Sequence, residues 1–152
     1  MKLQAHFKNI QSVIIEHLHA ATSEVLAAVA WFTDREIFDV LCKKAQAGLC
    51  ISVSLLDDEI NKAPGSLNFQ RLIRLGGKVT FLPVGSDGAP MMHHTLCVVD
   101  GISVIAGTYS WSKKSQINDE NITVITEAPD FADQCRKTFC GLMGKENQSS
   151  KT

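Results

Sequence analysis

The sequence has no pair of cysteines at the C-x-x-C spacing of zinc and redox sites. It contains five cysteines, an odd number: Cys42, Cys50, Cys97, Cys135 and Cys140. Four of the five lie in apolar stretches. Cys135 and Cys140 lie five positions apart with no histidine nearby. We therefore expect reduced thiols in the core. No metal or other cofactor is predicted.

The chain also lacks a long hydrophobic run. Its first residues, Met1–His6, have no apolar centre of the kind found in signal peptides. No other stretch approaches the roughly 20 apolar residues that cross a bilayer as a helix. The sequence therefore predicts no membrane span and a cytoplasmic location.

An excess of charge of either sign is missing as well. Fifteen Lys and Arg residues balance sixteen Asp and Glu residues, so the net charge is −1. Such a chain has no overall basic field that would hold nucleic acid, and a polyanion would have to be bound locally. Aromatic residues make up 7% of the chain and are too few and scattered to indicate a platform for stacking bases.

What remains is a normal globular composition. The chain has 152 residues, of which 45% are hydrophobic and 20% charged. A domain of this size buries roughly 70% of the surface of its unfolded chain, so its core needs no disulfide or metal ion for stability. No internal repeat or linker is visible. We predict one domain over residues 1–144 and a polar, disordered C-terminal tail over residues 145–152.

The first half alternates helical periodicity with short apolar runs. The expected elements are a helix over 10–22, a strand over 24–33, a helix capped by Thr33 or Asp34 and ending near Gly48, a strand over 50–56, a helix over 67–75 and a strand over 78–84. Residues 57–65 have the composition of a loop, with an acidic triplet typical of a solvated turn or cap. This alternation predicts a largely parallel sheet in this half.

The second half changes character. Two apolar strands, over residues 91–99 and 102–106, are joined only by Asp100-Gly101, a strong hairpin signal. A strand over 122–126 follows, and Pro129 begins a final helix. Together the two halves predict an α/β domain with a mixed, largely parallel sheet and helices on both faces.

Residues that can carry chemistry gather in this second half. They lie in three segments: Met92–Gly101, which contains two histidines and an acid, the turn Gly107–Trp111, and Asn118–Asn121. A histidine, a hydroxyl-rich turn and acids along consecutive strands are typical of a site that cleaves phosphodiesters, here without its cation. Taken singly, the histidine can be structural, the acid a hairpin residue and the tryptophan part of the core.

The order and spacing of four segments resemble those of a single-motif member of the phospholipase D superfamily, and the similarity covers nearly the whole chain. These segments are Ala28–Thr33, His93–Gly101, Gly107–Ser112 and Asn118–Asn121. The signature of that superfamily is H-x-K-x-x-x-x-D, then G-[ST]-x-N-W, then N-x-E-N. Two positions depart from it, because Thr95 replaces the lysine and Ser110 the asparagine. The resemblance implies an α-β-α sandwich.

The resemblance also implies roles. His93 would attack phosphorus to give a phosphohistidine, Glu120 would orient its imidazole, and Asp100 would complete the catalytic motif. A second histidine must protonate the leaving oxygen, and single-motif members obtain it from a homodimer with a twofold axis. This scheme requires no metal. Four further positions would bind the phosphate: Thr95, Thr108, Ser110 and Asn118.

The two departures predict weak catalysis. A lysine donates charge-assisted hydrogen bonds to phosphate, which Thr95 cannot do. Losing one preorganised donor typically reduces the rate on the order of 100 to 1000-fold. Lys113 and Lys114 follow the Trp111 turn and are candidates for a surrogate cation, although an exposed basic pair on a loop is the simpler interpretation.

Three hypotheses follow. The first is a homodimeric phosphodiesterase of nuclease type with impaired activity. Its substrate would be a nucleic acid or another phosphodiester, and the missing membrane span favours nucleic acid over lipid. The second is an inactive pseudoenzyme that serves as a phosphate- or nucleic-acid-binding or scaffolding module. The third is an unrelated α/β protein with accidental similarity. The sequence indicates no protein partner other than a second copy.

Overall fold

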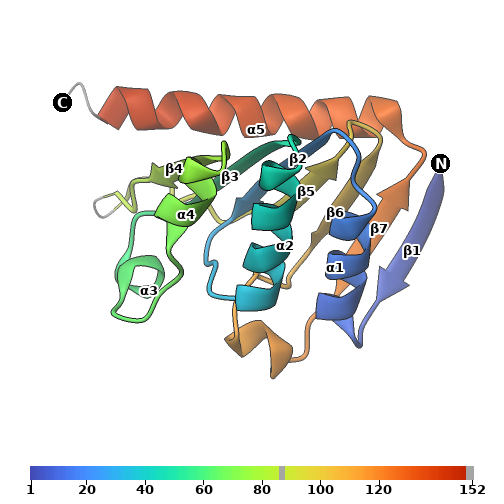
Figure 1. The fold of residues 1–152 in the computed structure, drawn as a ribbon, viewed down its shortest axis with the longest axis horizontal. Coiled ribbons are helices and arrows are strands. Elements are labelled where there is room, and N and C mark those ends of the chain that lie inside the picture. Colours follow the sequence, from blue (N-terminus) through green and yellow to red (C-terminus); the bar gives the residue numbers. More distant parts are fainter. Residues whose placement is uncertain (86–87, 150–152) are drawn as a thin grey trace.

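A seven-stranded mixed sheet forms the centre of the molecule, with strand order β1-β7-β6-β5-β2-β3-β4 (Figure 1). The computed structural model describes residues 1–85 and 88–149, without the side chains of 145–149. Its strands are β1 (Lys2–His6), β2 (Glu24–Val29), β3 (Cys50–Leu56), β4 (Lys78–Leu82), β5 (Thr95–Val99), β6 (Ser103–Gly107) and β7 (Ile122–Thr126). Its helices are α1 (Ile10–His19), α2 (Arg35–Gln46), α3 (Glu59–Lys62), α4 (Phe69–Arg74), η1 (Lys114–Gln116) and α5 (Pro129–Ser149).

The sheet is parallel only in its first half. β2 pairs with β3 and β3 with β4 in parallel, as the alternation of strands and helices predicts. β5, β6 and β7 form an antiparallel meander that joins β2 on one side and β1 on the other. The prediction of a largely parallel sheet is therefore wrong in this detail. The short connection at Asp100-Gly101 permits only an antiparallel pair, and β7 then pairs with β6, and β1 with β7, in the antiparallel direction as well. The mixed α/β class is confirmed.

The hairpin between β5 and β6 forms at Asp100-Gly101 as predicted. Both residues have positive φ, 54° and 64°, and the Ile102 amide donates to the Val99 carbonyl at 3.1 Å. Two consecutive positive φ angles belong to the turn type that matches the twist of the flanking strands. This turn fixes the register of β5 against β6.

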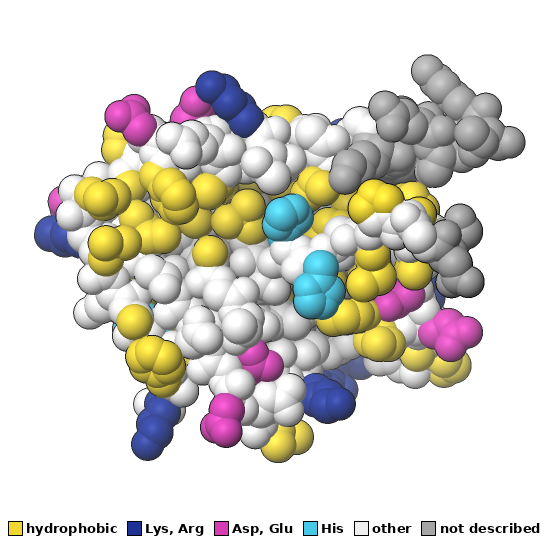
Figure 2. Space-filling model, turned by 180° about the vertical axis from the view of Figure 1, so that it is seen from behind, with side chains coloured by type: hydrophobic (Ala, Val, Ile, Leu, Met, Phe, Trp, Pro, Cys, Tyr) yellow, Lys and Arg dark blue, Asp and Glu magenta, His cyan; other side chains and the backbone are white. Residues whose placement is uncertain are grey.

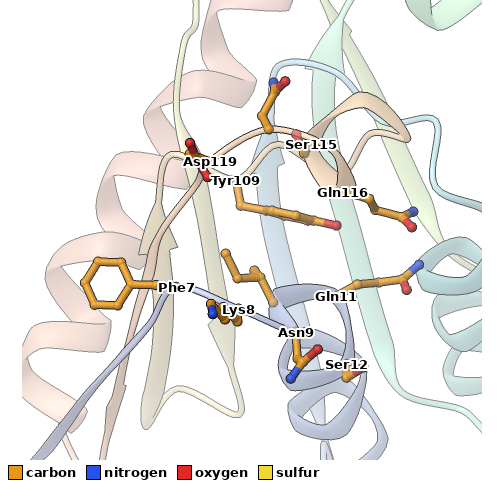
Figure 3. Close-up of a pocket in the computed structure, with 11 residues that line it drawn as sticks. Phe7, Lys8, Asn9, Gln11, Ser12, Tyr109, Ser115, Gln116 and Asp119 are labelled. Carbon is orange, nitrogen blue, oxygen red and sulfur yellow. The ribbon is translucent and has the colours of Figure 1, made fainter.

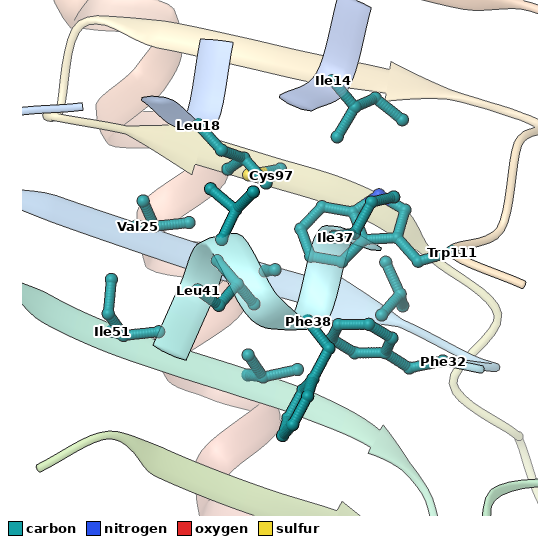
Figure 4. Close-up of a cluster of buried hydrophobic side chains, with 14 of the residues drawn as sticks. Ile14, Leu18, Val25, Phe32, Ile37, Phe38, Leu41, Ile51, Cys97 and Trp111 are labelled. Carbon is teal, nitrogen blue, oxygen red and sulfur yellow. The ribbon is translucent and has the colours of Figure 1, made fainter. Parts of the chain in front are cut away.

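Helices cover both faces of the sheet. On one face α1, α2 and α4 pack over the larger core, part of which is drawn in Figure 4. On the other face α5 crosses the strands and buries a second cluster through Ala132, Phe139 and Leu142. The strands are continuous apolar runs where they are covered on both faces, as in β2. The result is the α-β-α sandwich that the sequence predicts.

Several boundaries differ from those expected. β1 lies at the sheet edge and is exposed, so its sequence carries no burial pattern that predicts it. A short helix, α3, forms in the expected loop over 57–65 because the Asp58 side chain accepts from the Asn61 amide at 3.0 Å. α5 continues to Ser149, past the expected domain end at residue 144. The last residues of the predicted tail, 150–152, lie outside the described residues.

The cysteines agree only in part with the sequence prediction. All five are free thiols, but only Cys42 and Cys97 are buried, whereas Cys50 and Cys140 are exposed. Burial raises the pKa of the Cys97 thiol to about 12, so it remains protonated. Within residues 1–85 and 88–149, no helix is both long and apolar enough to cross a membrane.

Candidate active site

One edge of the sheet collects the residues of the sequence motifs. β2 and β6 end at this edge, whereas β5 and β7 begin there, because β5 runs antiparallel to β2 and to β6, and β7 antiparallel to β6. His93 therefore precedes β5, Ser110 follows β6 and Glu120 precedes β7 at the same edge. Four chain segments that are distant in sequence meet there.

His93 lies against Trp31. The two rings meet edge to face with 5.7 Å between their centroids and 83° between their planes. The imidazole is exposed to solvent, and the indole is half-buried. The indole N–H donates to Asp58 Oδ2 at 2.7 Å, which fixes the orientation of the Trp31 ring. Trp31 therefore acts as a fixed wall beside the candidate nucleophile.

The chain around Trp31 is held from inside by a buried asparagine. Asn61 is 1% exposed; its Oδ1 accepts from the Phe32 amide at 2.9 Å, and its Nδ2 donates to the carbonyls of Ala30 and Leu56 at 2.9 and 2.8 Å. Asn61 thus provides hydrogen-bond partners for three backbone groups just beyond the ends of β2 and β3. Asn61 therefore positions the segment that carries Trp31.

The turn after β6 is joined to the same segment from the other side. The Trp111 carbonyl accepts the amides of Thr33 and Asp34 at 2.8 and 3.0 Å, and the buried Trp111 ring packs edge to face on Phe32 at 5.2 Å. The Lys113 amide donates to Thr33 Oγ1 at 2.9 Å. Trp111 is thus a core residue whose backbone anchors the turn.

The two departures from the motif occupy defined positions. Thr95 opens β5 opposite Val29 and is half-buried. Ser110 donates its hydroxyl to the Trp31 carbonyl at 2.8 Å. The Ser110 hydroxyl is therefore already hydrogen-bonded to the backbone beside the site.

Thr108 and Asn121 close the junction between β6 and β7. The Asn121 carbonyl accepts the Thr108 amide at 3.0 Å, and Thr108 Oγ1 accepts the Asn121 amide at 3.0 Å. Gly107 permits this close approach, because a Cβ there would lie 2.2 Å from the Asn121 oxygen. Thr108 therefore holds the start of β7, just after Glu120, where Asn118 Nδ2 lies 3.4 Å from Glu120 Oε1.

A pocket of about 490 Å³ lies beside this junction (Figure 3). Tyr109 and Asn118 line it together with Asp119 and the residues that begin α1. The Tyr109 side chain is 2% exposed, and its hydroxyl has no hydrogen-bond partner among the described residues. Burial, with the nearby carboxylates of Asp34 and Glu120, raises the pKa of Tyr109 to about 12. The phenol therefore remains protonated and can act only as a neutral hydrogen-bond group.

Lys113 and Lys114 line a second pocket, of about 440 Å³, at the end of β2. The remaining lining residues are Trp31, Thr33, Ile60 and Ser112. Trp31, which lines this pocket, also contacts the candidate nucleophile His93. Both lysine side chains are exposed.

Asp100 lies at the opposite edge of the sheet from His93. The five residues of β5, about 17 Å in length, separate the two. Its carboxylate accepts the backbone amides of Thr22, Ser23 and Glu24 at 2.9, 2.8 and 3.0 Å. The structure therefore does not bring Asp100 together with the other motif residues, and its contacts are those of a structural tie to the start of β2.

These contacts set the pKa of Asp100. Partial burial alone would raise the pKa, but the hydrogen bonds from Glu24, Ser23 and Thr22 outweigh it and lower the pKa to about 2. The folded pKa is thus depressed, so the stabilisation is present above about pH 4 and is lost as the pH falls towards 2.

We expect Asp100→Asn to lower the free energy of unfolding by about 1–2 kcal/mol at pH 7. Asparagine tolerates the positive φ of this position. The substitution therefore removes the charge and turns one of the two accepting oxygens into an amide group that cannot accept from Thr22. Urea unfolding of both proteins between pH 7 and pH 2.5 measures the difference, which is expected to shrink towards pH 2.5. A difference independent of pH would contradict the assignment.

Within the part of the chain that the structure describes, no three His, Cys, Asp or Glu side chains gather closely enough to hold a metal ion.

Residues 14–143 match the protein family described as "Cardiolipin synthase, PLD-like domain". The chain belongs to this PLD-like family. It is also 23% identical, over 125 residues, to a mitochondrial cardiolipin hydrolase of Chlamydomonas reinhardtii. That match covers 81% of the chain and 53% of the relative, so the chain spans about half the length of this curated relative.

Several solved structures share the fold of this PLD-like chain. The phospholipase D family member Nuc from Salmonella typhimurium superposes with a TM-score of 0.83 at 16% identity, over 95% of each chain. NucT from Helicobacter pylori gives a TM-score of 0.80 at 19% identity, over 95% of this chain and 96% of its own. TrmBL2, an archaeal chromatin protein with a novel mode of DNA binding, gives 0.69 at 15% identity, over 95% and 53%.

Some residues at this edge were not singled out from the sequence. Trp31, Asn61 and Tyr109 support or line it, but in the sequence each resembles an ordinary apolar or loop residue. The one signal is positional: Trp31 lies just beyond the carboxyl end of a buried parallel strand, where ligand sites of α/β sheets gather.

Proposed function

We propose that this PLD-like protein is a phosphodiesterase of nuclease type that works as a homodimer through a phosphohistidine. The observation that carries the proposal is the position of His93, exposed at the sheet edge where β5 and β7 begin and held against an oriented Trp31. A nucleophilic imidazole needs solvent access and a fixed direction of attack, and this position offers both.

The proposed reaction has two steps. His93 attacks phosphorus, a P–N bond forms and the bond to the leaving oxygen breaks, while His93 of the partner subunit protonates that oxygen. Water then attacks the phosphohistidine, the P–N bond breaks, and the partner's His93 accepts the proton of the water. Glu120, which shares the edge, would orient His93, and Thr95, Thr108, Ser110 and Asn118 would surround the phosphate.

Activity is proposed to be weak. Thr95 supplies no positive charge, and the Ser110 hydroxyl donates to the Trp31 carbonyl rather than to a ligand. Lys113 and Lys114, in the pocket that adjoins Trp31, are the candidates for a surrogate cation.

We expect slow turnover of a bis-aryl phosphodiester and of single-stranded oligonucleotides by the wild type, and none by His93→Ala. His94→Ala is the matched control, because His94 is the neighbouring histidine, is exposed like His93, and has no role in the motif. Steady-state release of the phenol and gel analysis of the oligonucleotide measure the rates. If wild type and His93→Ala are equally inert, the catalytic proposal fails.

An uncovered apolar surface supports the dimer. α5 covers only part of its face of the sheet, and Figure 2 shows hydrophobic side chains in a band across this side of the molecule. β1 contributes Leu3, which is 65% exposed, and Ala5, while Leu96 of β5 and Ala106 of β6 are half-buried. Such a surface on a monomer is typical of an interface. A twofold contact on this face would bring two copies of the sheet edge together.

We expect Leu3→Glu with Ala5→Glu to convert the dimer into a monomer and to abolish hydrolysis that depends on His93. Gln4→Glu is the control, because Gln4 lies on the same strand but pairs with Val124, whose side chain faces the opposite core. Sedimentation velocity at micromolar concentration gives the mass. A wild-type monomer under these conditions would exclude the shared cleft.

A second function is a binding module without catalysis. Its support is the replacement of the motif lysine and asparagine, together with the likeness of the fold to TrmBL2, which binds DNA. Oligonucleotide binding by the wild type without any turnover that depends on His93 would favour this function.

A further inference from the structure

We propose that the pocket lined by Trp31, Thr33, Ile60, Ser112, Lys113 and Lys114 binds single-stranded nucleic acid, with one base stacked on Trp31 and the adjoining phosphate held by the two lysines. This subsite would place the strand next to His93. The inference deepens the proposed function and rests on it for the nature of the substrate, but it concerns binding and not cleavage.

The pocket has a fixed aromatic wall. The Trp31 indole N–H is bound to Asp58, and the Trp31 carbonyl accepts the Ser110 hydroxyl, so the ring and its backbone are both held. Ile60, 53% exposed, extends the apolar lining. Stacking of a base needs a flat apolar surface that is already oriented, and any base can use it. The sequence has too few aromatic residues for an extended platform, but one tryptophan in this position suffices for one base.

The mouth of the pocket carries the complementary charge. Lys113 and Lys114 are exposed, and the Lys113 backbone is tied to Thr33, which places this basic pair beside the ring. The carboxylate of Asp58, beside the ring, already accepts from the indole and from the Asn61 amide. A volume of about 440 Å³ lies within the range of sites for small ligands, roughly 300–1,000 Å³. A base joined to a phosphate matches the aromatic wall and the two lysines of this pocket.

A single strand fits better than the alternatives. A base inside a duplex has no free face to stack on Trp31. The headgroup phosphate of a phospholipid would also pair with the lysines, but its acyl chains offer no flat face to stack on Trp31. The phosphate of a nucleotide is linked directly to the sugar that carries the stacked base.

Fluorescence offers a direct test, because the chain has only two tryptophans and Trp111 is buried in the core. The experiment titrates His93→Ala protein, in which turnover is removed, with an oligothymidylate of about 10 nucleotides. We expect quenching of the emission as bases stack. Adding Trp31→Leu is expected to remove the quenching and to weaken binding roughly 10 to 100-fold. An oligonucleotide with abasic sites is expected to bind about as weakly.

The lysines are tested by salt dependence. Lys113→Gln with Lys114→Gln is expected to lower the slope of log K against log salt by about 0.7 for each phosphate that the protein no longer neutralises. Lys43→Gln with Lys78→Gln removes the same charge at the opposite edge of the sheet and is expected to leave the slope unchanged. An equal change in both pairs would overturn the proposal.

Two further outcomes would also overturn it. One is equal affinity for the thymidylate and abasic strands. The other is quenching by vesicles of cardiolipin and phosphatidylcholine but not by the oligonucleotide, which would assign the pocket to lipid. Failure of the proposed function is separate, because it appears as absent turnover in the wild type while quenching in His93→Ala persists.

Discussion

Thr95→Lys combined with Ser110→Asn is expected to raise phosphodiester hydrolysis at least about 1000-fold over the wild type. Each substitution restores a donor to a site in which one preorganised donor is typically worth roughly 100 to 1000-fold. In a twofold cleft every substitution acts twice, so four donors return for each site.

The structure accommodates both side chains. Thr95 is the first residue of β5, opposite Val29. It lies two residues after His93, which contacts Trp31. A lysine there is half-buried at the edge, with a long stem that can reach solvent. Asparagine at position 110 has two amide hydrogens, so one can donate to the Trp31 carbonyl, as the serine does, while the other remains for a ligand.

The control is the same double variant carrying His93→Ala. Turnover of the bis-aryl phosphodiester is measured for the wild type, for His93→Ala, and for the double variant with and without His93→Ala. If the gain disappears with His93, the site is intact and the natural protein lacks only its phosphate donors. A gain that survives in His93→Ala would show hydrolysis elsewhere on the molecule. No gain at all would contradict the assignment of Thr95 and Ser110 to phosphate binding.

The fold was predictable where local patterns decide it. The Asp100-Gly101 hairpin follows from a turn that requires positive φ, and the parallel strands β2 to β4 follow from their alternation with helices. The edge strand β1 was not predictable, because its exposed residues owe their conformation to pairing with β7. The sequence did not predict that β5, β6, β7 and β1 pair antiparallel, because the direction of a strand depends on its partners in space.

The site was predictable in part for the same reason. The motif spacing indicated His93, Ser110 and Glu120, and the fold brings them to one edge. Asp100 belongs to the same motif, but its carboxylate faces the amides of Thr22–Glu24 at the far edge. Sequence spacing does not state at which end of a strand a residue falls. Contacts such as that of Trp31 with Asp58 depend on loops whose paths no local pattern fixes.

Gly107→Ala is expected to destabilise the protein by about 3 kcal/mol, which corresponds to roughly 10 °C in the melting temperature for a chain of this size. The added Cβ would lie 2.2 Å from the Asn121 oxygen and 2.7 Å from the Ile122 Cα. Both are backbone atoms at the start of β7, so no side-chain rotation relieves the clash. β6 and β7 must separate just where Thr108 and Asn121 exchange their hydrogen bonds.

Alanine substitutions at two other glycines, Gly77 and Gly141, provide the comparison for the loss of stability expected at Gly107. At Gly77 a Cβ would meet the Leu72 side chain at 2.7 Å, which can shift, although the Leu72 carbonyl lies at 3.0 Å. At Gly141, within α5, the space is open, and alanine is expected to stabilise the helix by about 0.5–1 kcal/mol. Thermal unfolding of the three variants should therefore rank Gly107→Ala lowest and Gly141→Ala above the wild type.

Because the clash at Gly107 involves the strand that leads out of Glu120, a Gly107→Ala protein as stable as the wild type would mean that β7 can move at no cost. The motif edge would then be far less rigid than its hydrogen bonds indicate.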